Sequence, residues 1–129
     1  MAQVNSTCNE LYKITASLLN ANAMFITCDA GDMSGFTAAT NAPATEIVTN
    51  GFGRQAGTRS VLQTVVANDT MQIFYLYTAN ANQNVNGHEV MSANASGNMY
   101  GYCKYNAMQP CQTNDTLNAI MQFQSEVGA

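Results

Sequence analysis

Few side chains in this sequence could carry out chemistry. The one histidine, His88, is followed directly by Glu89, and the remaining carboxylates are scattered along the chain. A histidine that acts as a base needs an orienting acid on the same side of the backbone, whereas neighbouring strand residues point to opposite faces. His88 and Glu89 therefore cannot form such a pair through adjacency. The sequence predicts no catalytic residue, and we expect the protein not to be an enzyme.

The four cysteines are the other reactive side chains: Cys8, Cys28, Cys103 and Cys111. They form no Cys-x-x-Cys pair, and the histidine is far from them in the sequence, so we expect no metal site and no cofactor. An even number of cysteines permits disulfides in more than one connectivity. The shortest candidate link joins Cys103 to Cys111, and the alternative is that all the thiols are buried and free.

A long segment without a strand pattern carries the first candidate contacts to another protein. Residues 29–44 are a mixture of Gly, Ala, Thr and Asn that predicts a loop, and loops of this length in compact domains are often functional. Asp29 and Asp32 lie at its start, but the ligand ladder and terminal glutamate of a calcium loop are missing. We expect this loop to contact a partner, with Asp29, Asp32, Met33 and Phe36 as the candidate residues.

Tyrosines in a later predicted strand supply a second group of candidate contacts. Tyr100, Tyr102 and Tyr105 lie around Cys103. Tyrosine gives a large contact area at little entropic cost, so Tyr100 and Tyr102 are candidate interface anchors. The alternative is that these tyrosines line the core and keep their hydroxyl groups at its rim.

The low charge of the chain limits its partners. Only 9% of the residues are charged, against about 25% in typical soluble proteins, and the net charge is -4. The four Lys and Arg residues are too few to neutralise a run of phosphates, so we expect no nucleic-acid binding. A surface of Asn, Gln, Ser and Thr lacks the like-charge repulsion that keeps monomers apart. It suits packing against a partner or other copies, and the alternative is a neutral soluble domain.

No segment predicts a role in a membrane. No apolar run approaches the roughly 20 residues that are needed to cross a bilayer. Residues 1–7 lack a basic start followed by an apolar stretch. We therefore expect neither an export signal nor a membrane anchor.

The elements that position these residues are indicated by turns and by alternation. In residues 64–79, Asn68 and Asp69 predict a turn, and β-branched and aromatic residues then alternate from Ile73 to Tyr77. The same pattern of a turn followed by a strand recurs in residues 113–124. These two segments indicate a sheet protein.

The remaining strands follow from shorter signals. A buried strand is predicted over residues 22–28. A hairpin turn is predicted at Asn50-Gly51, because both residues accept positive φ. After this turn, a strand is predicted over residues 52–66, with a bend near Gly53 and Gly57. Further along, the sequence predicts an exposed loop over residues 80–86 and then a short strand near His88. A turn over residues 92–98, a strand over residues 99–105 and a connection from Met108 to Pro110 follow. Together with the next element, these predict an antiparallel β-sandwich of about seven to eight strands with one N-terminal α-helix.

That helix is predicted from the N-terminal segment. Apolar residues from Leu11 to Leu18 recur at helical spacing after several helix-capping residues, which predicts an amphipathic helix over residues 6–20. The helix would cover a sheet face, or act as an arm that docks on a neighbouring subunit. We divide the chain into an N-terminal helix or arm over residues 1–21 and a β-sandwich over residues 22–129, within a single domain.

Two motifs carry a resemblance to a known family. Residues 46–54 read Glu-Ile-Val-Thr-Asn-Gly-Phe-Gly-Arg, and residues 68–70 read Asn-Asp-Thr before a predicted strand. The chain resembles a family of small virion proteins of tailed bacteriophages, often labelled tail-fibre-like. Members share a Glu-Ile-x-x-x-Gly-x-x-Arg segment, followed by an Asn-Asp-Thr turn and a β-strand. The resemblance covers roughly residues 20–125, and this chain departs from the family at residues 86–89 and in its cysteines.

The resemblance implies a non-enzymatic structural protein of the virion, assembled in the host cytoplasm. The first expectation is a capsid decoration (cement) protein that binds the major capsid protein and other copies of itself, as a homo-oligomer that we take to be a trimer. The alternatives are a tail or head fibre module that binds a host surface and, from another class, a self-assembling extracellular filament subunit. The resemblance supplies no catalytic, cofactor-binding or metal-binding residues.

Overall fold

The described part of the chain consists of strands and the loops between them. The computed structural model describes residues 3–10, 24–62 and 70–124. The strands are β1 (Gln3–Glu10), β2 (Phe25–Asp29), β3 (Gln55–Ala56), β4 (Thr58–Leu62), β5 (Thr70–Thr78), β6 (Gln83–Met91), β7 (Met99–Cys111) and β8 (Thr116–Gln124). The predicted mainly β class is therefore confirmed.

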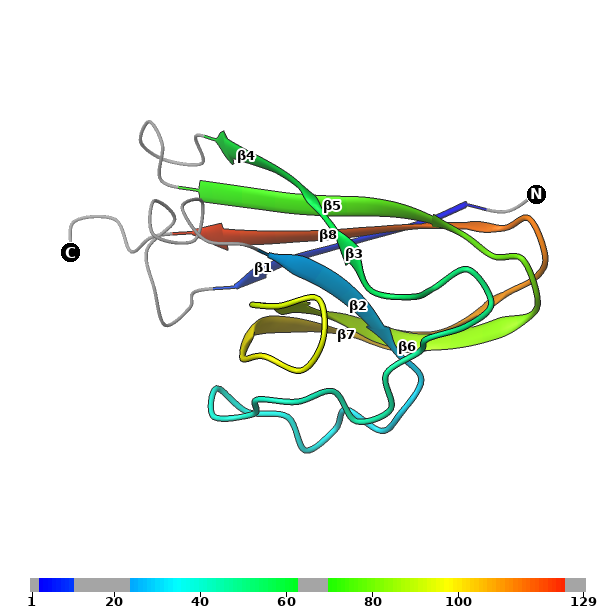
Figure 1. Ribbon diagram of the computed structural model, residues 1–129, viewed down its shortest axis with the longest axis horizontal. Coiled ribbons are helices and arrows are strands. Elements are labelled where there is room, and N and C mark those ends of the chain that lie inside the picture. Colours follow the sequence, from blue (N-terminus) through cyan, green and yellow to red (C-terminus); the bar gives the residue numbers. More distant parts are fainter. Residues whose placement is uncertain (1–2, 11–23, 63–69, 125–129) are drawn as a thin grey trace.

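The strands form two four-stranded sheets. One sheet has the order β1-β8-β5-β4, and the other has the order β3-β2-β6-β7. Neighbouring strands are antiparallel except for β1, which runs parallel to β8 at the edge of the first sheet. Figure 1 shows β4, β5 and β8 in one layer and β2, β6 and β7 in another. The long loop after β2, drawn in cyan, runs along the outside of the second layer.

A single hydrophobic core is shared by the two sheets. The first sheet contributes alternate residues of β5 and β8, among them Ile73 and Met121, and the second contributes Ile26 and Val90. This alternation is the period of two that a half-buried strand requires, so the strands predicted over Ile73 to Tyr77 and after Asn114 are confirmed. The Tyr77 hydroxyl joins the sheets, because it donates to the Ile26 carbonyl at 2.8 Å.

The turn predicted at Asn50-Gly51 is confirmed, but it does not join two paired strands and is therefore not a hairpin. Asn50 has a φ of 61° and Gly51 a φ of 88°, both in the left-handed region. A Cβ on Gly51 would lie 2.2 Å from the Thr78 carbonyl oxygen, so only glycine fits against the end of β5. The strand predicted over residues 52–66 is shown only in part. Residues 52–54 are not in a strand, β3 and β4 lie on either side of Gly57, where a bend was expected, and residues 63–66 lie outside the described part of the chain.

The N-terminal helix predicted over residues 6–20 is not shown. Residues 6–10 instead belong to β1, where Thr7 pairs with Ile120 of β8. Residues 11–20 lie outside the described part of the chain. Pairing with the open edge of β8 satisfies backbone groups that would otherwise face solvent, whereas a helix of this length is marginal alone. The turn predicted at Asn68 and Asp69 also lies outside the described residues.

Two strands extend further than the sequence predicted. β6 begins at Gln83, inside the loop expected over residues 80–86, and β7 continues to Cys111 through the expected connection. The two extensions pair with each other, with Asn84 opposite Pro110. Proline is tolerated here because β7 is an edge strand and its outer side needs no amide donor.

The predicted Cys103–Cys111 disulfide was wrong. Cys103 takes part in a disulfide, while Cys28 and Cys111 are free thiols. Cys103 and Cys111 lie on the same strand, β7, opposite His88 and Gln83 of β6, and those two residues are roughly 17 Å apart at the rise of an extended chain. A disulfide needs Cα atoms within about 7 Å, so the predicted Cys103–Cys111 link cannot form, and the alternative of free thiols throughout is excluded by Cys103 itself.

A pair of methionine variants tests the shared core. Met121 of β8 is 0% exposed, whereas Met108 of β7 is 46% exposed. We expect Met121→Ala to lower the free energy of unfolding by about 2–4 kcal/mol, because it removes buried contacts and leaves a cavity. Met108→Ala should change it by less than about 0.5 kcal/mol. Urea unfolding followed by circular dichroism measures both, and equal losses would contradict a core at this position.

Candidate functional site

The loop after β2, residues 30–45, is anchored at both ends by one buried carboxylate. Asp29 Oδ1 accepts hydrogen bonds from the amides of Gly31 at 2.7 Å and Thr45 at 2.9 Å, and Oδ2 accepts one from Ala44 at 2.8 Å. Asp29 is fully buried, so it is not available to a partner, and the prediction that it contacts one was wrong. It holds together the two ends of the loop instead.

An ion pair next to Asp29 extends this anchor. Arg54 donates from Nε to Glu46 Oε2 and from Nη2 to Glu46 Oε1, both at 2.8 Å. The Arg54 side chain is only 6% exposed and the Glu46 side chain is 25% exposed, so the guanidinium is shielded from water while the carboxylate is partly open to it. Thr27 of β2 donates its hydroxyl to Glu46 at 2.6 Å. The turn at Asn50-Gly51 brings Glu46 and Arg54 together, which gives a physical reason for the spacing Glu-Ile-x-x-x-Gly-x-x-Arg.

Arg54 also holds the turn between β6 and β7. Its Nη1 donates to the carbonyl oxygens of Ala93 at 2.7 Å and Ser96 at 2.8 Å. A second contact joins this turn to the long loop, because Asn41 donates to the Asn98 side chain at 3.0 Å and accepts from the Met99 amide at 3.0 Å. The loop and the turn therefore form one continuous surface.

Glu89 completes the buried group of polar side chains. It lies opposite Thr27 in the pairing of β2 with β6, and neither oxygen of its carboxyl accepts a hydrogen bond from the described residues. Its partner is the carboxylate of Asp29, to which a protonated Glu89 can donate. Burial, followed by the nearby carboxyls of Asp29 and Glu46, raises the pKa of Glu89 to about 11. Glu89 is therefore protonated and neutral at pH 7. We call Thr27, Asp29, Glu46, Arg54 and Glu89 the buried polar cluster.

The pKa values of the other two acids respond to the same cluster. Burial raises the pKa of Asp29, but its interactions with Glu89 and with three backbone amides outweigh burial and hold this pKa below its ordinary value. Burial likewise raises the pKa of Glu46, and the hydrogen bonds from Arg54 and Thr27 more than offset it. Asp29 and Glu46 are thus charged, while Glu89 is neutral.

His88 and Glu89 lie on opposite faces of β6, as the sequence predicted for neighbouring strand residues. The His88 ring is buried on the core side, where Nδ1 lies 2.8 Å from the Tyr105 hydroxyl and Nε2 lies 3.1 Å from the Ile120 carbonyl oxygen. Burial lowers the pKa of His88 to about 4, so the ring is neutral at pH 7. It connects the two sheets and does not approach the buried polar cluster.

The other predicted contact residues of the loop have different positions. Asp32 is exposed, and its Oδ1 accepts a hydrogen bond from the Ser34 amide at 2.9 Å. Met33 is only 2% exposed, and its sulfur packs so closely on Gly87 that a Cβ added to this glycine would lie 2.5 Å from the sulfur. Met33 therefore seals the loop against β6, and the prediction that it contacts a partner was wrong.

The aromatic candidates brace the loop from the side of β7. Phe36 and Tyr102 are half-buried, and their rings meet edge to face with the centroids 5.2 Å apart. The Tyr102 hydroxyl donates to the Phe36 carbonyl oxygen at 3.2 Å.

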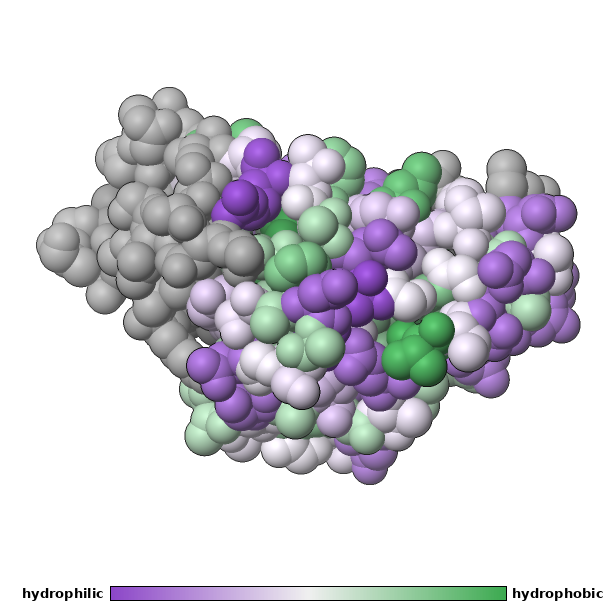
Figure 2. All heavy atoms as spheres, in the orientation of Figure 1, coloured by the Kyte–Doolittle hydropathy of each residue, from purple (hydrophilic) through white to green (hydrophobic). Residues whose placement is uncertain are grey.

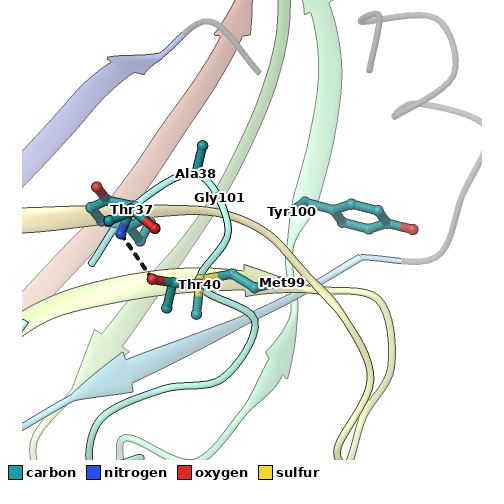
Figure 3. Close-up of a pocket in the computed structure, with 7 residues that line it drawn as sticks. Thr37, Ala38, Thr40, Met99, Tyr100 and Gly101 are labelled. Atoms are coloured by element: carbon teal, nitrogen blue, oxygen red, sulfur yellow. Dashed lines mark hydrogen bonds between the residues drawn. The ribbon is translucent and has the colours of Figure 1, made fainter. Parts of the chain in front are cut away.

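Tyr100 is half-buried and packs against the core. In Figure 3 its ring points away from Thr37 and Thr40. The hollow in this region measures about 10 Å³, which is room for about one water molecule and too little for a ligand.

The exposed surface that results is uncharged. Residues 34–44 of the loop and 94–98 of the turn contain no Asp, Glu, Lys or Arg, and most of them are exposed. We call these two segments the outer surface. In Figure 2 the lower rim of the molecule, where the loop runs, mixes purple, white and pale green and has no large apolar patch. The outer surface therefore offers amide, hydroxyl and methyl groups to a partner.

Sequence reasoning missed the roles of Glu46, Arg54 and Glu89. The signal for the first two was present in the spacing of residues 46–54, but it was read only as a family motif. Nothing local marks Glu89 as buried, since its burial depends on the loop that covers it.

Asp29 can be tested against Asp32, an exposed acid of the same loop. We expect Asp29→Asn to lower the free energy of unfolding by about 2 kcal/mol or more, because an amide accepts the three N–H groups more weakly and with one oxygen. Asp32→Asn should change it by about 0.5 kcal/mol or less. Urea unfolding at neutral pH measures both. The anchor is refuted if the two variants lose the same stability.

The protonation of Glu89 predicts a pH dependence of stability. The folded-state pKa of Glu89 is raised to about 11 from an ordinary 4.5, so the stability linked to this group is full below about pH 4.5 and declines as the pH rises towards 11. Glu89→Gln remains neutral at every pH, so we expect it to be more stable than the wild type at about pH 8, by about 1 kcal/mol or more.

Glu46→Gln provides the contrast, because Glu46 is charged and paired with Arg54. We expect this variant to be less stable than the wild type at the same pH, since it leaves a buried guanidinium without its counter-ion. Urea unfolding at about pH 5 and about pH 8 measures both variants. A Glu89→Gln variant that is destabilised as much as Glu46→Gln at the higher pH would show that Glu89 is ionised in the folded protein.

The described residues contain no group of three or more His, Cys, Asp or Glu side chains that could hold a metal ion. Within the same ranges, no helix is long and apolar enough to span a membrane. Comparisons with protein-family models, with curated proteins and with solved structures found no match.

Proposed function

We propose that this chain is a structural protein of a bacteriophage particle, most specifically a capsid decoration protein that binds the outside of the head shell. In this proposal the two sheets pack as a β-sandwich that serves as the body, and the outer surface contacts the major capsid protein. The observation that carries the proposal is the anchoring of an uncharged surface loop by a buried carboxylate and a partly buried ion pair.

The anchoring favours assembly because it prepares the loop for binding. A loop that is held at both ends, and braced by Phe36 against Tyr102, loses little conformational freedom when a partner covers it. The favourable contact energy is then not consumed by ordering the loop. A surface intended only to connect two strands would need neither the three amide contacts to Asp29 nor the link from Arg54 to the neighbouring turn.

The absence of charge on the outer surface favours a partner that is present in many copies. Contacts between amides, hydroxyls and methyl groups are little affected by salt. Each copy needs only a weak interaction, because neighbouring sites on a repeating shell act together. Contacts between copies, as a homo-oligomer, would add to the same effect. The resemblance of residues 46–54 to a virion protein family supports this proposal, and the Glu46–Arg54 pair gives that motif a structural role.

Copy number distinguishes this proposal from the fibre and filament alternatives. In purified particles that carry the protein, we expect an amount comparable to that of the major capsid protein, measured by gel densitometry or quantitative mass spectrometry. A few copies per particle would contradict decoration and favour a fibre. Recovery of the protein as free filaments, with none on particles, would favour the filament subunit.

A charge placed on the outer surface tests the contact itself. Ala39 is exposed in the loop, and Ala56 is exposed on β3 away from it. We expect Ala39→Glu to weaken binding to undecorated capsids by about tenfold or more, because a carboxylate would be buried without a partner, while Ala56→Glu binds normally. Wild-type protein should remain bound in about 1 M NaCl. Release by salt, or equal effects of the two variants, would contradict the proposed contact.

A further inference from the structure

A polar groove lies beside the loop and is separate from the outer surface. Its volume is about 240 Å³, and it opens between the first residues of the loop and the exposed part of β7. Its walls are Gly31, Asp32 and Met33 on one side and residues 104–108 on the other, with Asn86 between them.

A bulge in β7 forms one wall of the groove. Val85 pairs with Gln109, and Gly87 pairs with Lys104, so a single residue of β6, Asn86, lies opposite residues 105–108. The extra residues must leave the plane of the sheet, as in other bulges, which are common next to binding sites. Asn106, Ala107 and Met108 are accordingly exposed.

The facing wall is fixed by hydrogen bonds. The side-chain nitrogen of Asn86, Nδ2, donates to the carbonyl oxygens of Ala30 at 3.1 Å and Gly31 at 2.9 Å. Asp29 holds the amide of Gly31 from the other side. Both walls are therefore in place before any ligand binds, and a preformed site requires little reorganisation.

The groove presents donors and acceptors in nearly neutral balance. Lys104 and Asp32 supply one positive and one negative charge, and Lys104 makes no ion pair with the described residues. Hydrogen bonds from Ser34, and to a lesser extent the charge of Lys104, lower the pKa of Asp32, so Asp32 is ionised at pH 7. Because both donors of Asn86 are engaged, its oxygen is left to accept, and Asn106 adds an exposed amide.

This set of groups selects against most ligand classes. An anion would face the carboxylate of Asp32, and a cation would face the ammonium group of Lys104. An apolar ligand would bury polar side chains without partners. A neutral ligand with many hydroxyl groups can form hydrogen bonds with the charged and the amide side chains of the groove alike. The exposed Met108 side chain can cover an apolar face of its ring.

We propose that the groove between Asp32 and Lys104 binds a neutral carbohydrate. Its volume lies below the range of roughly 300–1,000 Å³ for drug-sized ligands, so it accommodates about one sugar ring, either free or as one unit of a longer chain. This site does not depend on the proposed role in the capsid, since it uses none of the residues of the outer surface.

Nuclear magnetic resonance titration tests the site directly. Isotope-labelled wild-type protein is titrated with glucose, galactose, mannose and N-acetylglucosamine, each to about 50 mM, because a ligand of this size binds with a dissociation constant of millimolar order. We expect at least one sugar to shift the backbone resonances of Asp32, Lys104 and Asn106 in a saturable manner. An oligosaccharide of that sugar should bind at least as tightly, which distinguishes a chain from a free monosaccharide.

Paired variants and competing ligands make the result decisive. Asn106→Ala should weaken binding of that sugar by about fivefold, the ratio expected for one lost hydrogen bond, whereas Asn94→Ala, in an exposed turn outside the groove, should not. Unchanged spectra with every sugar would overturn the proposal. So would equal shifts with phosphate or with free alanine, which would identify an anion or zwitterion site, or full binding by the Asn106→Ala variant.

Discussion

The carboxylate of Asp29 is the interaction on which the surface of this protein depends. A buried negative charge must be compensated, and here the compensation comes from hydrogen bonds from the neutral carboxyl of Glu89 and from the amides of Gly31, Ala44 and Thr45. If the loop opened, Asp29 would lose all three of these amide hydrogen bonds together, and water would replace them only in part. A segment with no regular secondary structure thereby gains the fixed shape that is normally supplied by a strand.

Four of the twelve acidic and basic residues of the chain, Asp29, Glu46, Arg54 and Glu89, belong to this network. With 9% of its residues charged, the protein nevertheless buries Asp29 and shields Arg54, while residues 34–44 and 94–98 carry no charge. Burial of such side chains is unusual, because Asp, Glu and Arg are almost never fully buried unless they are paired. This distribution produces a rigid neutral face, which is suited to contact with other proteins, and leaves the groove at Lys104 as a separate polar feature.

Local patterns predicted the local features. The turn at Asn50-Gly51 and the strands β5 and β8 were predicted correctly, because φ preferences and alternation act between near neighbours. Features that depend on distant partners were not predicted. β1 was mistaken for a helix, since the edge that it pairs with lies at the other end of the chain. Asp29 and Met33 were expected at the surface, because nothing in the loop sequence shows that it folds back over β6.

Native-state hydrogen exchange would test the anchored loop most directly. The account predicts that the amides of Gly31, Ala44 and Thr45, which donate to Asp29, exchange as slowly as the paired amides of β2 and β6, while the amide of Ala38 exchanges rapidly. If the three amides exchange as fast as Ala38, the loop opens independently of the sheet. The buried carboxylate would then not hold the surface, and the central claim would be wrong.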